Sequence, residues 1–173
     1  MHAAAIHGPF TDVELVERPE VWLIDDLFAY WDRKRAGRIG PPRAEIDPAE
    51  IKIHLPNVFM LDVLDGGADF RFRLIGTRIV DGLGRDSTGR KVSELYSDPP
   101  AAAAGLQAMF KLVVDRKAAV FARGRVFWAP EARYRRFAGA GFPLSKDGVT
   151  VDVVLGELFI ELGGTFAKPR QAT

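Results

Sequence analysis

The chain contains no cysteine, and this absence removes several kinds of chemistry at once. Disulfide bonds, thiolate nucleophiles, zinc sites with cysteine ligands and iron–sulfur clusters all need the missing thiol. Blue-light sensing through a cysteine adduct is excluded for the same reason. A chain without disulfides suits the reducing cytoplasm, and we expect a cytoplasmic location.

Long apolar runs and a strong charge of either sign are also missing. No run approaches the ~18 residues that a membrane-spanning helix needs, and the first ten residues lack the charged start and apolar core of a signal peptide. The formal net charge is +1, from 24 basic and 23 acidic residues, so overall charge attracts neither nucleic acid nor an anionic membrane. We therefore expect no nucleic-acid partner and no membrane partner.

The chain does have enough apolar material for one folded domain. It has 173 residues, of which 47% are hydrophobic, and this length suits a single domain with a helical extension. We expect a loosely ordered lead-in over residues 1–18, a helical extension over 19–55, the main domain over 56–162 and a tail over 163–173.

Helical signals come first along the chain. Apolar residues recur at helical spacing from Val21 to Trp31, and the basic run 33–35 suits the end of that helix. Asp47-Pro48 has the form of a second helix start, which Leu55-Pro56 would soon close.

Strand signals stand on both sides of a helical middle. The first strand is expected over 59–64, and a turn at 65–68 leads into the second strand, which begins at Asp69. Three more strands are expected at 118–128, 134–144 and 150–162. This order predicts an α+β fold with one five-stranded antiparallel sheet and short central helices on one of its faces.

Residues 69–90 are the most informative stretch. Phe70 and Phe72 share one face of a strand, and the period becomes helical after Gly76-Thr77. Three glycines between positions 82 and 89 then mark a passage of turns. We expect this segment to lie across the sheet and to leave a pocket beneath it.

Five short motifs follow one another along the chain. They are a Leu–Tyr–Trp helix, an Asp-Pro helix start, a Leu-Pro before the first strand, an Arg-Leu-x-Gly-Thr and a Gly-Arg-Asp-x-Thr-Gly-Arg, formed by Leu27, Tyr30, Trp31, Asp47, Pro48, Leu55, Pro56, Arg73, Leu74, Gly76, Thr77 and residues 84–90. In this order, over roughly residues 20–162, the chain resembles a family of bacterial stand-alone PAS-like proteins. The resemblance implies a PAS-like sensor fold that holds a small ligand between sheet and helices, or mediates protein contacts, often as a dimer. It implies no catalytic residues.

The pocket walls are expected from the strands and the central helices. The predicted ligand-binding residues are Phe59, Leu61, Phe72, Leu74, Thr77, Arg78, Leu83, Phe110 and Phe137, with Ile79 and Val120 in the same walls. Thr77 and Arg78 are chosen because free N–H groups at a helix start favour a polar ligand. Glycines at 139, 141 and 156 would leave room above the sheet. Alternatively, the apolar residues simply fill a core.

The sequence identifies no cofactor. A flavin is compatible with it, whereas haem would need an axial ligand, and His54 is expected outside the cavity as a structural or exposed residue. No nucleophile elbow, phosphate loop or metal-binding spacing appears, so we expect neither an enzyme nor a metal site. A small α+β enzyme with Asp62 or Asp152 as its base is a minor alternative. Asp86 is expected to cap the next turn or to pair with a neighbouring arginine.

Together these patterns predict a cytoplasmic sensor module that binds a small molecule. We expect a homodimer formed through the Trp22–Trp31 helix, and a signalling partner protein, because no effector segment is recognised in the sequence. The ligand must bind one conformation better than another to transmit a signal. The alternative is a pure protein-interaction domain without a ligand.

Overall fold

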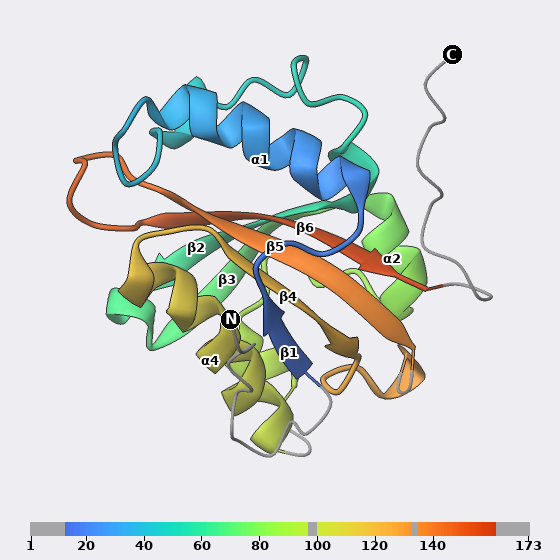
Figure 1. Cartoon of the computed structure of the whole chain (residues 1–173). Helices are drawn as coiled ribbons and strands as arrows, with labels where there is room; N and C mark the ends of the chain where they lie inside the picture. Colours follow the sequence, from blue (N-terminus) through green and yellow to red (C-terminus); the bar gives the residue numbers. More distant parts are fainter. Residues whose placement is uncertain (1–12, 97–99, 133–134, 162–173) are drawn as a thin grey trace, which may run out of the picture.

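The computed structural model describes residues 13–96, 100–132 and 135–161 (Figure 1). Its strands are β1 (Val13–Val16), β2 (Val58–Leu64), β3 (Asp69–Ile75), β4 (Val120–Arg125), β5 (Arg136–Leu144) and β6 (Val153–Ile160). Its helices are α1 (Trp22–Arg35), α2 (Thr77–Leu83), α3 (Val92–Leu95) and α4 (Pro100–Arg116), with 3₁₀ turns at Arg43–Glu45, Leu55–Asn57, Asp65–Gly67 and Pro130–Ala132. The predicted tail, 163–173, lies outside the described residues.

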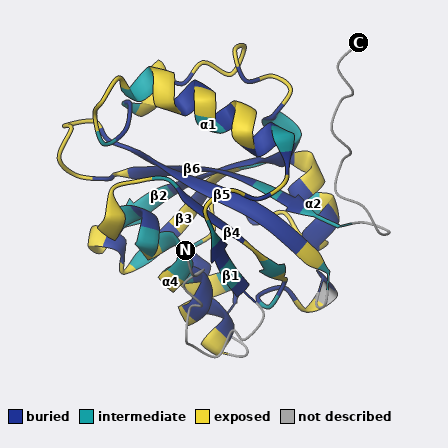
Figure 2. Cartoon of the chain, in the orientation of Figure 1, coloured by how far each residue is buried: buried dark blue, intermediate teal, exposed yellow. Residues whose placement is uncertain are grey.

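The strands form one antiparallel sheet in the order β1-β4-β5-β6-β2-β3, with helices on both faces. Helix α1 crosses one face, and α2, α3 and α4 cover the other (Figure 1). The central strand β5 is buried along all but its first residue, as Figure 2 shows. The predicted α+β fold with an antiparallel sheet is therefore confirmed.

The sheet has six strands where the sequence predicted five. The additional strand, β1, pairs with β4, so that Val13 lies opposite Gly124 and Val16 opposite Phe121. Val13 and Leu15 are buried against the core on the α4 side. Strand β1 lies within residues 1–18, which were predicted as a loosely ordered lead-in. The strand was not predicted because an alternation of four residues is too short to indicate a strand.

The hairpin between β2 and β3 has the predicted glycine turn and a bulge that was not predicted. Gly66 and Gly67 adopt φ values of +68° and +102°, which glycine reaches without strain. Further along, Met60 pairs with Leu74 while Leu61 pairs with Phe72, so Arg73 is an extra residue in β3. Such a bulge exchanges the two faces of the strand beyond it.

Helix α1 packs its apolar side onto the sheet of its own chain. The Trp31 ring stacks on Phe142 with centroids 5.6 Å apart, and its indole Nε1–H donates to the Pro143 carbonyl at 2.9 Å. Phe28 contacts the Phe121 and Phe142 rings. Much of the apolar surface of the helix predicted to form a dimer, Trp22–Trp31, is thus covered within the chain. The dimer itself stays a prediction.

The Asp47-Pro48 segment forms turns, so the helix predicted there is wrong. The Asp47 carboxylate accepts from the Ala49 N–H at 2.8 Å, as a cap would, but no regular helix follows. Contacts with α1 hold this segment instead: the Tyr30 hydroxyl accepts from the Asp47 N–H at 3.1 Å and donates to Glu50 at 2.8 Å.

Candidate ligand cavity and a buried polar cluster

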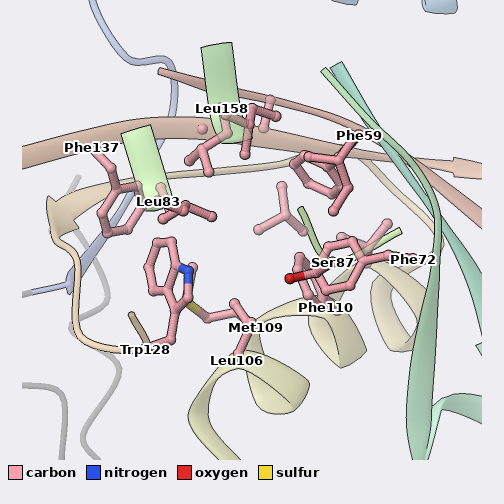
Figure 3. A pocket seen from close by; sticks show the side chains of 18 of the residues that line it. Phe59, Phe72, Leu83, Ser87, Leu106, Met109, Phe110, Trp128, Phe137 and Leu158 are labelled. Atoms are coloured by element: carbon pink, nitrogen blue, oxygen red, sulfur yellow. The ribbon is translucent and has the colours of Figure 1, made fainter. Parts of the chain in front are cut away.

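A cavity lies between the sheet and the helices α2 and α4 (Figure 3). The volume of the cavity is about 80 Å³. One water needs about 10–15 Å³ by this measure, and an apolar cavity of ~150 Å³ holds benzene. The lining residues are Phe59, Phe72, Ile75, Ile79, Leu83, Ser87, Tyr96, Leu106, Met109, Phe110, Val113, Val120, Ala122, Trp128, Phe137, Gly139, Ala140, Gly141 and Leu158. None of them carries a charge.

The floor of the cavity comes from the sheet, where alternation on β5 directs Phe137, Gly139 and Gly141 toward it. A Cβ at Gly141 would lie 2.8 Å from a methyl group of Val113, so glycine lets α4 lie close to the sheet. Gly156 serves a different purpose, because the ring of Phe59 occupies the place of its missing side chain. Two of the three predicted glycines therefore line the cavity.

One side of α4 forms the wall facing the sheet. Leu106, Met109 and Val113, which share one side of the helix at three- and four-residue spacing, all line the cavity. Phe110 contacts the rings of Phe59 and Phe70 at centroid distances of 5.7 and 5.4 Å. This aromatic group fills the part of the space nearest β2 and β3.

The remaining wall is α2 with the loop that follows it. The Asp86 carboxylate accepts from the N–H and the hydroxyl of Thr88 at 3.0 and 2.7 Å, which confirms the predicted cap and lowers the pKa of Asp86. Two backbone bonds then attach the loop to β3: Gly89 N–H donates to Phe72 O at 2.7 Å, and Phe72 N–H donates to Arg90 O at 3.0 Å. This geometry holds Ser87 on the cavity side.

Five of the nine predicted ligand-binding residues line the cavity: Phe59, Phe72, Leu83, Phe110 and Phe137. The other four are placed elsewhere. Leu61 is fully buried in the same core without lining the cavity, and Thr77 and Arg78 are exposed on α2.

Leu74 is 41% exposed, and the bulge at Arg73 explains why. Strict alternation from Phe72 would direct Leu74 into the cavity. The extra residue reverses the alternation, so Ile75 lines the cavity in its place. Ligand binding at this cavity remains a prediction.

Sequence reasoning missed three polar residues of the lining, Ser87, Tyr96 and Trp128. Ser87 is the variable position of the Gly-Arg-Asp-x-Thr-Gly-Arg motif, and its place between a capping Asp and a Thr was the available signal. Trp128 was assigned to a strand, whereas it follows β4 in the connection to β5. Its ring stands edge-on to Phe137 at 5.1 Å.

The two aspartates considered as enzyme bases do not line the cavity. The Asp62 carboxylate pairs with Arg73 at 2.6 Å, and the Asp152 carboxylate accepts from the Lys146 N–H at 2.9 Å. Among the described residues, no group of three or more histidine and acidic side chains has the geometry of a metal site. A three-ring flavin needs more room than benzene, so the cavity in this shape does not fit one.

A second polar feature lies on the opposite face of the sheet, beneath α1. His54 and Glu157 are 2% and 0% exposed, and His54 Nδ1 lies 2.9 Å from Glu157 Oε1. His54 Nε2 lies 3.0 Å from a carboxylate oxygen of Asp26 on α1. His54 thus joins β6 to α1 and is structural and outside the cavity, as expected, but its two acidic partners were not foreseen.

Burial and mutual contact shift the pKa values of His54 and Glu157. Burial lowers the pKa of His54, but the hydrogen bonds and charges of Glu157 and Asp26 outweigh it and raise the pKa above the usual 6.5. Burial also raises the pKa of Glu157. Glu157 Oε2 is buried without a hydrogen-bond partner among the described residues, so His54 is what compensates this carboxyl group.

A family model described as "PAS domain" matches residues 23–158. The match spans most of the chain, and the chain therefore belongs to the PAS domain family. No curated protein matches it. PAS domains are in general sensory or interaction modules without enzymatic activity. Within the described residues, no helix is long and apolar enough to cross a membrane.

Proposed function

We propose that this chain is a PAS sensor domain whose signal is the occupancy of the cavity between the sheet and the helices α2 and α4. The observation that carries the proposal is the cavity itself. Protein interiors are normally filled, so a cavity of about 80 Å³ beneath the loop that is hydrogen-bonded to β3 is a reason to expect a ligand. The uncharged, aromatic lining suits a small molecule that is mainly apolar.

The route from the cavity to α1 runs through β6. Leu158 lines the cavity, and the preceding residue, Glu157, faces the other side of the sheet, where it contacts His54. The side-chain amide of Asn57, three residues after His54, donates to the Leu158 carbonyl at 3.0 Å. A ligand that shifts β6 by a small amount would therefore change the His54–Asp26 contact with α1.

The output of the domain is proposed to be protein contact, without catalysis, in the cytoplasm. Helix α1 presents Asp25, Ala29 and Asp32 to solvent, and Trp22 and Phe28 are only partly covered. This outer side is where a second copy or a signalling partner would meet α1. The support is the position of α1 over the face that receives the Glu157–His54 contact.

The test is native mass spectrometry of the freshly purified protein, compared with its denatured mass. We expect a retained small molecule in the wild type and none in Ala122→Phe, because Ala122 lines the cavity and a phenyl ring there would occupy it. Ala104→Phe is the matched control, since Ala104 is exposed on α4. A wild type that is empty, and that takes up no added small molecule, favours the alternative of a pure protein-interaction domain.

A further inference from the structure

Two polar side chains face the cavity without a hydrogen-bond partner in the part of the chain that the structure describes. Ser87 and Trp128 are 2% and 4% exposed. Within the described residues, neither the Ser87 hydroxyl nor the Trp128 Nε1–H makes a hydrogen bond to protein. Figure 3 shows the oxygen and the nitrogen both directed toward the middle of the cavity.

Polar groups that line an apolar cavity are unfavourable unless a molecule inside the cavity forms hydrogen bonds with them. Two other buried polar groups show the contrast. The Trp31 indole donates to Pro143 O, and the buried hydroxyl of Ser145 accepts from the Gly148 N–H at 2.9 Å. Ser87 and Trp128 are therefore positioned for something that enters the cavity.

The chemistry of the two groups limits what can satisfy them. An indole N–H can only donate, and a hydroxyl can donate or accept. A ligand that satisfies both must offer at least one acceptor atom. Among the described residues, no charged side chain lines the cavity, so an ionised ligand would lose its hydration without an opposing charge.

We infer that the ligand is an uncharged, mainly hydrocarbon molecule with a carbonyl or ether oxygen that accepts from Trp128 and Ser87. This inference rests on the proposed function, because it names the ligand class of the same cavity. The volume of about 80 Å³ sets the size: a molecule near that of benzene enters only if a wall side chain moves. Met109 has the flexibility to do this and is partly exposed.

The test uses three probes of similar shape: cyclopentanone, methylcyclopentane and cyclopentanecarboxylate. Their dissociation constants are measured by NMR titration, and the indole N–H signal of Trp128, one of three tryptophans, reports the hydrogen bond directly. For each protein, the affinity for the ketone is divided by the affinity for the hydrocarbon, and these ratios are then compared between the variants. A change in stability affects both affinities alike and cancels in the ratio.

We expect Ser87→Ala and Trp128→Phe each to lower that ratio about three- to tenfold, the usual effect of one neutral hydrogen bond. The Trp128 indole signal should move downfield with the ketone and not with the hydrocarbon. Ser145→Ala is the matched control, because this buried serine lies outside the cavity lining and should leave the ratio unchanged. The carboxylate should bind at least about tenfold more weakly than the ketone.

A ratio that is the same in all four proteins, or a carboxylate that binds as tightly as the ketone, would overturn the inferred ligand class. In that case the probes still bind, and the proposed function stands. If none of the three probes shifts any cavity resonance, the proposed function fails together with the inference.

Discussion

Removing His54 should destabilise the fold far more than removing its exposed partner. Among the described residues, His54 is the one side chain that hydrogen-bonds the buried carboxyl group of Glu157, whose second oxygen has no partner, and His54→Ala removes it. Breaking a buried pair in this way costs about 3–5 kcal/mol. For a chain of this size that corresponds to a fall in Tm of roughly 6–20 °C.

Two further variants isolate the cause. Asp26→Asn changes a side chain that is 61% exposed and should cost less than about 1 kcal/mol. The double variant His54→Leu with Glu157→Leu removes the unpaired charge together with its partner, and should recover most of the stability lost in His54→Ala.

The assay is urea unfolding at neutral pH, followed by tryptophan fluorescence, since Trp31 lies on the same face as the cluster. The free energies of unfolding of the four proteins are compared, provided that their dependence on urea concentration, the m-value, is the same. The reasoning is refuted if His54→Ala costs no more than Asp26→Asn, or if the double variant is as unstable as the single one.

Three other predictions follow from particular contacts. Because the pKa of His54 is raised in the folded chain, its contribution to stability is complete below about pH 6.5 and declines as pH rises through the raised value; the wild type should lose its advantage over His54→Gln across that range, and a pH-independent difference would contradict this. Asp86→Ala should speed amide exchange at Thr88 and Gly89 while Asp86→Asn, which keeps an acceptor, does not; equal exchange in both would show that the cap does not hold the loop. If α1 mediates a dimer, Trp22→Glu should give monomers in sedimentation, and an unchanged assembly would exclude this helix from the contact.

Much of the architecture could be predicted because it follows from local periodicity. The α2 helix after Gly76, the hairpin at 65–67 and the apolar side of α4 each appear in a few consecutive residues. The order of these elements, together with five motifs, led to the PAS family that the family model shows.

Features that depend on contacts between distant segments could not be predicted. The bulge at Arg73 arises in the pairing with β2, and it moved Leu74 out of the cavity and Ile75 into it. His54 and Glu157 are 103 positions apart, and neither shows in the sequence that it will be buried. Strand β1 is likewise defined by its pairing with the distant strand β4.

The most direct test of the central claim is a high-resolution crystal structure of protein purified without any step that extracts small molecules. We predict continuous non-protein electron density in the cavity, in contact with Ser87 and Trp128. A cavity whose walls have closed, or which holds only disconnected water, would contradict the account.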